Sequence, residues 1–282
     1  MRKKTTTAAQ KKKKTEQPSH TVLLDQFTDK IEEDHNIIFK PNVGPQTDFL
    51  AASEREVLYG GSAGGGKSYA MLADPLRFMD VPAFAGVLLR HTTEELRELI
   101  TKSQEMYPKI WPGIKWSERK MTWTAPSGAT LWLSYLDKDQ DVTRYQGLAF
   151  SWIGFDELTQ WATPFAWNYM RSRLRTADPS LPLSMRATTN PGGRGHHWVK
   201  KMFIDPAPAG KSFVATDIDS GEDLKYPAGH AKAGKPLFKR RFIPARLRDN
   251  PYLAQQGDYE AMLLSLPEQQ RRQLLDGDWD IK

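Results

Sequence analysis

The chain has no cysteine, and this absence removes several classes of function. Without thiols there is no disulfide framework, thiolate metal site or cysteine nucleophile, which favours an intracellular protein. Long apolar runs are missing too, since the longest cover only a few residues, such as 87–89. A bilayer span needs about 20 apolar residues, and the basic N-terminus lacks the apolar segment of a signal peptide. We therefore expect no membrane insertion. The 282 residues suffice for one large α/β domain, alone or with a small appendage.

The excess of positive charge lies at the N-terminus. Residues 1–17 hold seven Lys and Arg against Glu16 alone, and the rest of the chain has equal numbers of acidic and basic residues. A segment of Lys, Thr, Ala and Gln without apolar periodicity cannot offset its ordering entropy. Residues 1–20 are therefore predicted to be a disordered basic tail. It is either a solubilising segment without a partner or an electrostatic contact to DNA phosphates.

Short apolar runs alternate with amphipathic segments along the rest of the chain. The composition predicts strands at 56–59, 85–89, 150–155 and 184–188, a hairpin of 121–125 with 129–136, and helices at 68–78, 94–100 and 164–174. This alternation is typical of a mostly parallel sheet covered by helices. After about residue 238 the pattern changes to one strand, 242–245, followed by helix-rich sequence. We expect a core at 21–237 and a small helical subdomain at 238–282.

Residues 61–68 match the phosphate-binding pattern G-x-x-x-x-G-K-[ST] in full. They are Gly61, Ser62, Ala63, Gly64, Gly65, Gly66, Lys67 and Ser68. A strand is expected before them and a helix after them, as this motif requires. The glycines let backbone N–H groups converge on phosphate oxygens, and the helix adds the positive end of its dipole. In this motif Lys67 neutralises the β- and γ-phosphates, and Ser68 binds Mg²⁺.

Two adjacent carboxylates follow the apolar run at 150–155. They lie at the C-terminal end of a predicted strand, where α/β sheets bind ligands. Asp156 can hold Mg²⁺ through water, and Glu157 can orient and deprotonate the attacking water. An Asp-Glu pair also occurs as a plain strand-to-loop transition, but a complete phosphate-binding loop upstream favours the catalytic interpretation.

Two amides complete the candidate site. Asn190 lies in Thr188-Thr189-Asn190-Pro191 at the end of the next strand, where it can reach a γ-phosphate and report its loss. The same residues can also be a simple turn. Gln46, upstream of the first strand, could read adenine with its side-chain amide, although a lone Gln is more often a surface residue.

In this order and spacing, these elements resemble the ATPase half of the large terminase subunit of tailed bacteriophages, the DNA-packaging motor. The resemblance covers about residues 40–281. It rests on Pro45-Gln46-x-x-Phe49-Leu50, on Tyr59-Gly60 with the loop 61–68, on Gly154-Phe155-Asp156-Glu157-Leu158-Thr159-Gln160, on 188–199 with Asn190 and His196, on Phe242-Ile243-Pro244-Ala245, on Asp249-Asn250-Pro251-Tyr252-Leu253, and on 274–279.

The resemblance implies a fold, site roles and partners. The fold is a RecA-like (ASCE) P-loop NTPase with a C-terminal helical lid at 238–282. Gln46 is then the adenine-reading position, Asp156 and Glu157 are the Walker B acid and the catalytic acid, and Asn190 couples hydrolysis to movement. The cofactors are ATP and Mg²⁺. The partners are double-stranded DNA, the portal protein of the procapsid, the small terminase subunit, and other copies of this chain in a ring on the portal, all in the host cytoplasm.

One feature departs from that family. Large terminases usually continue into a nuclease with clustered Asp residues, whereas this sequence stops after Asp276, Asp278 and Asp280. A single short acidic segment does not enclose a two-metal site. We therefore expect a linker here and no nuclease activity. The nuclease is either part of a longer protein or encoded separately.

Other functions are left open by the sequence. A helicase or recombination ATPase of the RecA class lacks its second core here, and a nucleotide-dependent DNA-binding assembly module would not turn ATP over usefully. For a motor, hydrolysis is expected to need an arginine from a neighbouring subunit, because the phosphate loop has none. Arg144 is the main candidate, since its loop resembles the place of such a residue in related terminases. The rivals are Arg90, Arg171, Arg173 and Arg175.

Overall fold

The structure is a computed structural model that describes residues 39–281. Its main compact unit begins at Pro41. The predicted tail, 1–20, and the predicted start of the core at residue 21 lie outside the described residues. Over the described part of the chain, no helix is both long and apolar enough to cross a membrane.

Within residues 39–281, nine strands form one sheet in the order β3-β4-β5-β2-β6-β7-β1-β9-β8. The strands are β1 (Glu56–Gly61), β2 (Ala85–Arg90), β3 (Lys115–Ser117), β4 (Thr122–Thr124), β5 (Thr130–Tyr135), β6 (Trp152–Phe155), β7 (Ser184–Thr189), β8 (Ser212–Val214) and β9 (Lys239–Ala245). The six strands from β5 to β9 in this order pair in parallel, and β3, β4 and β8 add antiparallel edges. The predicted mostly parallel α/β sheet is confirmed. β7 lies between β1 and β6.

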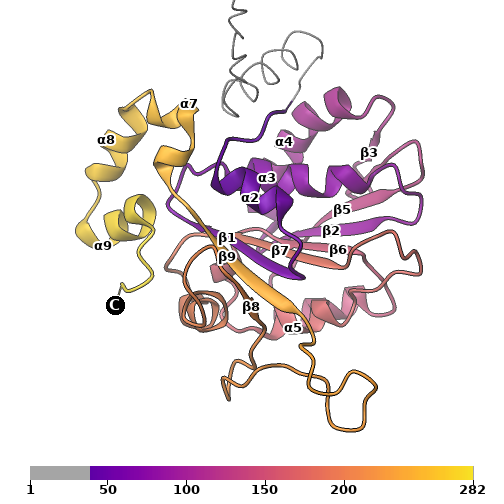
Figure 1. Cartoon of the computed structure of the whole chain (residues 1–282). Coiled ribbons are helices and arrows are strands. Elements are labelled where there is room, and N and C mark those ends of the chain that lie inside the picture. Colours follow the sequence, from indigo (N-terminus) through magenta and orange to yellow (C-terminus); the bar gives the residue numbers. More distant parts are fainter. Residues whose placement is uncertain (1–38, 282) are drawn as a thin grey trace, which may run out of the picture. The chain divides into compact units, whose positions relative to one another are not determined.

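Helices cover both faces of the sheet (Figure 1). The α-helices are α2 (Pro45–Ala51), α3 (Lys67–Ala73), α4 (Thr93–Ile110), α5 (Phe165–Arg171), α6 (His196–Val199), α7 (Pro251–Ala254), α8 (Asp258–Leu264) and α9 (Glu268–Arg271). Short 3₁₀ segments occur at Asp74–Phe78, Asp139–Tyr145, Leu158–Gln160 and Leu247–Asp249, and π segments at Lys200–Ile204 and Arg272–Asp276. Figure 1 shows α2, α3 and α4 over one face and α5 over the other.

Helix α4 is longer than the sequence predicted. A capping box starts it, because the Thr92 hydroxyl accepts from the Glu95 amide and the Glu95 carboxylate accepts from the Thr92 amide. It continues through Pro108 to Ile110. Its buried face includes Leu96, Leu99, Met106 and Tyr107. Its second half contains Pro108, a residue that usually ends a helix, which is why the sequence predicted a shorter one.

The C-terminal segment begins inside the sheet. The predicted boundary at residue 238 falls just before β9, which pairs with β1 from Glu56–Arg240 to Gly61–Ala245. The helices α7, α8 and α9 follow β9 as a separate group (Figure 1). The helix-rich sequence after this strand forms several short helices, and Gly257, with a φ of 68°, lies between α7 and α8. The action of these helices as a lid stays a prediction.

A buried ion network anchors β1 at the end opposite to the phosphate loop. Glu56 is fully buried and binds the guanidinium groups of Arg171 and Arg240, with 2.7 Å from Arg240 Nε to Glu56 Oε2. Burial opposes ionisation, but the two arginines outweigh it and lower the pKa of Glu56 below its usual value. The strand that carries the phosphate loop is thus fixed at its start.

Candidate active site

The phosphate loop joins β1 to α3, as the sequence predicted. Gly61, Gly64 and Gly66 have φ values of 142°, 75° and 75°, in the region that favours glycine. The buried hydroxyl of Tyr59 donates to the carbonyl oxygen of Gly65 at 2.8 Å, across the loop. The glycines therefore permit the curl of the loop, and Tyr59 fixes it from inside.

The C-terminal segment supports the loop from the other side. The amides of Ser62 and Ala63 donate to the carbonyl oxygens of Ala245 and Leu274 at 2.8 and 2.6 Å. The side-chain amide of Asn250 donates to the carbonyl oxygen of Gly64 at 2.7 Å. Residues after β9 are therefore part of the site.

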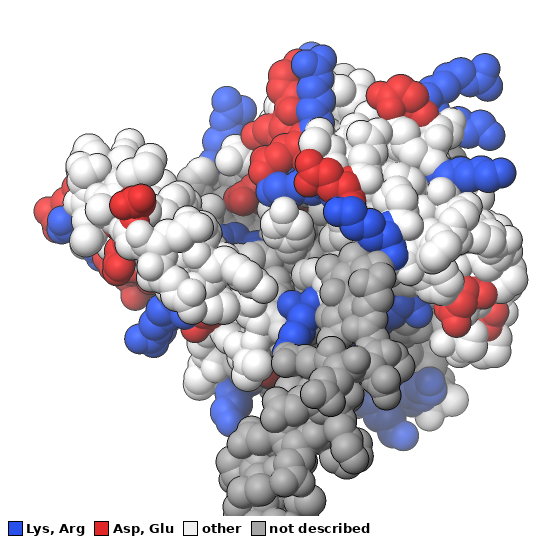
Figure 2. Space-filling model, turned by 90° about the horizontal axis from the view of Figure 1, so that it is seen from above, with Lys and Arg blue, Asp and Glu red and all other residues white. Residues whose placement is uncertain are grey.

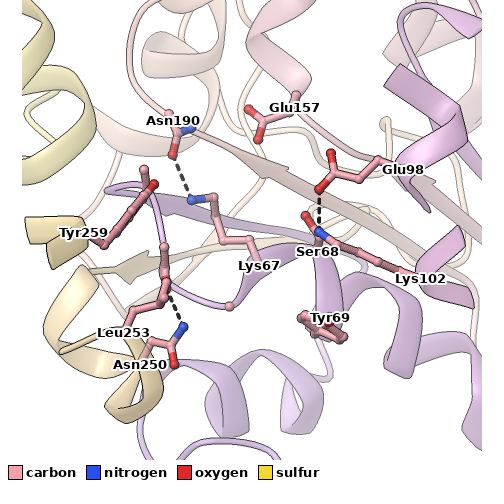
Figure 3. Close-up of a pocket in the computed structure, with 14 residues that line it drawn as sticks. Lys67, Ser68, Tyr69, Glu98, Lys102, Glu157, Asn190, Asn250, Leu253 and Tyr259 are labelled. Atoms are coloured by element: carbon pink, nitrogen blue, oxygen red, sulfur yellow. Dashed lines mark hydrogen bonds and ion pairs between the residues drawn. The ribbon is translucent and has the colours of Figure 1, made fainter. Parts of the chain in front are cut away.

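Lys67 lies at the centre of a cavity of about 320 Å³ (Figure 3). The cavity is lined by residues 63–69 and by Glu98, Lys102, Glu157, Asn190, Asn250, Leu253 and Tyr259. Lys67 Nζ donates to the carbonyl oxygen of Ser62 at 2.6 Å and to Asn190 Oδ1 at 2.8 Å. Burial lowers the pKa of Lys67, although the charges of Glu157 and Asp156 oppose this. Lys67, Asn190 and Glu157, which the sequence placed in one site, therefore line one cavity.

Glu157 reaches this cavity from the end of β6. Its φ of 62° and ψ of 55° place a non-glycine residue in the left-handed region, which costs about 1–2 kcal/mol. Such strain is common at functional sites. Figure 3 shows its carboxylate on the same side of the cavity as Asn190. Burial, and then the negative charge of Asp156, raise the pKa of Glu157. The adjacent acids thus have different environments.

Asp156 is fully buried and is not among the residues that line the cavity. The hydroxyl of Thr188 donates to its Oδ1, and Arg90 Nε lies 2.9 Å from its Oδ2. Despite this contact, Oδ2 accepts no hydrogen bond from the described residues. A lone pair of this buried carboxylate is therefore available to a metal ion. With Ser68 lining the adjacent cavity, these oxygens fit Mg²⁺, which keeps several waters and takes few protein ligands. Across residues 39–281, no cluster of three or more His, Cys, Asp or Glu is arranged for a metal.

Gln46 contacts the phosphate loop. Its Nε2 donates to the carbonyl oxygen of Gly66 at 3.0 Å, and its Oε1 accepts from the Asn42 amide at 2.6 Å. Gln46 is 4% exposed, so the interpretation as a surface residue is wrong. In this structure Gln46 ties α2 to the loop, and its role towards adenine stays a prediction.

Arg144 does not line the cavity that holds Lys67. It lies in the 3₁₀ segment before β6, where it pairs with Asp141 at 3.2 Å and stacks over the Tyr135 ring at 4.6 Å. Of the rivals, Arg171 is committed to Glu56, and Arg175 donates to the carbonyl oxygens of Gly147 and Leu148. Arg90 alone among these five lies beside a predicted site residue, Asp156.

Six residues that line the cavity have no role predicted from the sequence. They are Tyr69, Glu98, Lys102, Asn250, Leu253 and Tyr259. Asn250 and Leu253 belong to a segment that carried the family resemblance, so a signal existed for them. Glu98 and Lys102 form an i,i+4 pair, which by itself indicates only an exposed helix face.

The predicted linker at the C-terminus is packed in this structure. Gly277 lies against the phosphate loop, since a Cβ there would stand 2.8 Å from the Ser62 nitrogen. Trp279 is 7% exposed and stacks on His196 with 5.3 Å between ring centroids. Asp278 pairs with Arg272, and Asp280 lies 3.3 Å from Lys200 Nζ. These acids take part in local ion pairs.

Comparisons with known proteins concern the family and the fold of the chain. The family model described as "Terminase large subunit, T4likevirus-type, N-terminal" matches residues 58–280. No curated protein matched the chain. The large terminase of a thermophilic bacteriophage is 16% identical with a TM-score of 0.60, over 85% of this chain and 54% of that one. The large terminase ATPase domain of Thermus phage P74-26 is 13% identical with a TM-score of 0.53, over 86% of this chain and 94% of that one.

At such identities these structural matches show the fold, and the chain spans about half the length of the thermophilic bacteriophage's large terminase. That protein has also been solved in complex with ADP and with ATP-gamma-S.

Proposed function

Because the chain belongs to the family of T4likevirus-type large terminase subunits, we propose that it hydrolyses ATP to move double-stranded DNA into a procapsid. One observation carries this proposal: the phosphate loop, Lys67, Asn190 and Glu157 meet at one cavity. The nucleotide complexes of the thermophilic bacteriophage's terminase support ATP as the ligand.

Each residue has a distinct task in hydrolysis. The loop and Lys67 hold the β- and γ-phosphates, while Ser68 and Asp156 would hold Mg²⁺. Bound Mg²⁺ would neutralise phosphate charge. Glu157 accepts a proton from the attacking water, whose oxygen bonds to the γ-phosphorus as the bond to ADP breaks. The products are ADP and inorganic phosphate.

The contact of Asn190 with Lys67 supports a role for Asn190 in reporting the state of the phosphate. It now accepts from Lys67, and a γ-phosphate would compete for that lysine. Two residues further on, Gly192 lies against the Gln273 side chain, where a Cβ would stand 2.8 Å from its nitrogen. The same loop orients His196, whose Nδ1 accepts from the Gly192 amide at 2.9 Å and whose ring stacks on Trp279. A change at Asn190 can therefore reach the C-terminal segment.

The partners follow from a packaging role. We propose that copies of this chain form a ring on the portal of the procapsid in the host cytoplasm, with the small terminase subunit bringing the DNA. The two other interpretations, a RecA-class helicase and an assembly module that binds nucleotide without useful turnover, predict different biochemistry.

The test is packaging of DNA into purified procapsids, read as DNA protected from added nuclease. We expect protection with ATP and not with a non-hydrolysable analogue, with this chain alone or after addition of any separate nuclease subunit. Steady-state phosphate release, measured with and without DNA and portal, accompanies it. Turnover stimulated by DNA together with strand separation would favour the helicase, and binding without turnover would favour the assembly module.

A second assay concerns DNA cleavage. We expect no metal-dependent cutting of plasmid by this chain, because Asp276, Asp278 and Asp280 lie on one short segment. Nicking that disappears when one of these acids is changed to Asn would contradict this expectation.

A further inference from the structure

Arg90 lies between two carboxylates at the edge of the candidate active site. Its Nε is 2.9 Å from Asp156 Oδ2, and its Nη2 is 3.8 Å from Glu98 Oε2. The side chains of Arg90 and Asp156 are 9% and 1% exposed, whereas that of Glu98 is 58% exposed and lines the cavity. One guanidinium is thus shared between a buried and an exposed carboxylate.

The contact between Arg90 and Asp156 is an ion pair without a hydrogen bond. Neither Arg90 Nε nor Asp156 Oδ2 has a hydrogen-bond partner among the described residues, although both atoms are buried. A buried carboxylate without a nearby positive charge is strongly destabilising. Arg90 therefore supplies the positive charge that Asp156 needs, although the contact lacks hydrogen-bond geometry.

Glu98 offers the guanidinium a second partner. Its Oε1 is held by Lys102 Nζ at 2.6 Å, and its Oε2 faces Arg90. Both Glu98 and Lys102 lie on α4, so this carboxylate is positioned by a helix and not by a loop. A cation arriving at Asp156 would repel Arg90, because like charges a few ångströms apart interact strongly in a protein interior.

We propose that Arg90 is a positioning residue that pairs with Asp156 before a divalent cation binds and moves its ion pair to Glu98 when the cation arrives. The inference rests on the proposed function, since it assumes that the site takes Mg²⁺ with a nucleotide. In this proposal the Arg90–Glu98 pair tightens only when the metal site is occupied, so the state of the site is transmitted to α4.

The first test is thermal unfolding of the full chain without nucleotide, with and without MgCl₂ at constant ionic strength. Arg90→Gln leaves Asp156 without its cation, so we expect a lower unfolding temperature than wild type. We expect Mg²⁺ to raise that temperature by several degrees more than it raises that of wild type. Arg97→Gln removes an exposed charge from α4 and should respond like wild type.

The second test does not depend on the folding of Arg90→Gln. Glu98→Gln removes the second partner from an exposed position, and the protein should fold. We expect the free Mg²⁺ needed for half-maximal binding of fluorescent ADP to rise severalfold. Glu94→Gln, another exposed acid of α4, controls for the general loss of negative charge.

Two outcomes would overturn the inference. Equal destabilisation of Arg90→Gln with and without Mg²⁺ would make Arg90 a purely structural residue. An unchanged Mg²⁺ requirement in Glu98→Gln would show that Arg90 does not move its ion pair from Asp156 to Glu98. Failure of wild type to bind Mg²⁺ and ADP at all would instead contradict the proposed function, so the two failures are distinguishable.

Discussion

Lys67 and Glu157 line one cavity, and under the proposed function only Lys67 contacts the nucleotide in its ground state. Lys67 is buried and already directed by two acceptors, the carbonyl oxygen of Ser62 and Asn190 Oδ1. Glu157 carries a raised pKa, which suits a base that must give and take a proton near neutral pH. Binding and turnover should therefore separate by mutation.

We predict that Lys67→Ala weakens nucleotide binding by about 10- to 100-fold, the value of a lost charge-assisted contact. Glu157→Gln should keep binding and lose about 10²- to 10⁴-fold in turnover, because it acts on the attacking water alone. Fluorescent-nucleotide titration and phosphate release measure the two effects. Glu94→Gln, on the exposed face of α4, is the control for the loss of an acid. Hydrolysis by Glu157→Gln at the wild-type rate would remove this residue from the mechanism.

The raised pKa of Glu157 also predicts how stability depends on pH. Burial and the charge of Asp156 disfavour its ionised form in the folded chain. The resulting stability is present below the unfolded pKa of about 4.3 and is lost as pH rises through the higher folded pKa. Glu157→Gln stays neutral, so it should unfold at a higher temperature than wild type near neutral pH. This difference should shrink towards about pH 4 in thermal unfolding series. If the difference in unfolding temperature instead grew on acidification, the pKa of Glu157 in the folded chain would be lowered and not raised.

At the scale of elements, strands with a clear apolar pattern could be predicted from the sequence. Strands that form only because a neighbouring strand pairs with them could not. The runs before Gly61 and Asp156 are short and apolar, so buried strands followed directly from composition. β3 and β8 have three residues each and lie at the edges of the sheet, where pairing and not sequence decides the strand. Lys67, Glu157 and Asn190 could be placed together because parallel strands bring their C-terminal ends to one edge.

The C-terminal contacts could not be predicted, because they join residues about 200 positions apart and carry no local pattern. The loop amide of Ala63 meets the Leu274 carbonyl, and Gly277 lies against Gly61 and Ser62. Nothing in Leu274 or Gly277 taken alone indicates such a partner.

Gly277→Ala tests whether this segment supports the phosphate loop. Gly277 and Gly257 have φ values of 65° and 68°, so alanine at either costs about 1–2 kcal/mol of backbone strain. A Cβ at Gly277 would also stand 2.8 Å from the Ser62 nitrogen, whereas one at Gly257 meets nothing within 4 Å. We predict that Gly277→Ala loses more stability than Gly257→Ala and that nucleotide affinity falls in Gly277→Ala alone. Thermal unfolding and nucleotide titration measure both. Equal nucleotide affinity in the two variants would show that the segment around Gly277 does not support nucleotide binding.

At the scale of the whole molecule, charge is unevenly distributed along the sequence. The excess lies in residues 1–17, outside the described part. On the face seen in Figure 2, acidic and basic side chains lie next to one another and not in separate fields. A salt-sensitive part of DNA binding is therefore expected from the N-terminal residues.

Deletion of residues 1–17 should leave ATP turnover intact and weaken DNA association mainly at low salt, where phosphate contacts contribute most. DNA binding over a salt series and phosphate release measure the two effects. Replacing Lys11 to Lys14 with Gln keeps the length of the segment and tests charge alone. A collapse of turnover in the deletion variant would give the segment a structural role.

The last prediction concerns the assembled ring. An arginine that stabilises the negative charge on the transferring phosphoryl group increases the hydrolysis rate by about 10³- to 10⁵-fold. Among the described residues that line the cavity there is no arginine. Arg144 is 35% exposed, although it pairs with Asp141 and stacks over the Tyr135 ring, so we expect it to be within reach of a neighbouring subunit. Arg144→Ala should bind ATP normally and hydrolyse it poorly, and Arg119→Ala, an exposed arginine on the same chain, should behave like wild type.

Mixing separates a contribution in trans from one in cis. Glu157→Gln subunits keep Arg144 but cannot turn over, and Arg144→Ala subunits keep Glu157 but lack the arginine. In mixed rings, a Glu157→Gln subunit should supply its arginine to the site of an Arg144→Ala neighbour. We therefore expect phosphate release to exceed the sum of the two separate variants and to peak at intermediate mixing ratios. Absence of rescue at every ratio, with co-assembly shown independently, would exclude Arg144 as the residue supplied across the subunit boundary.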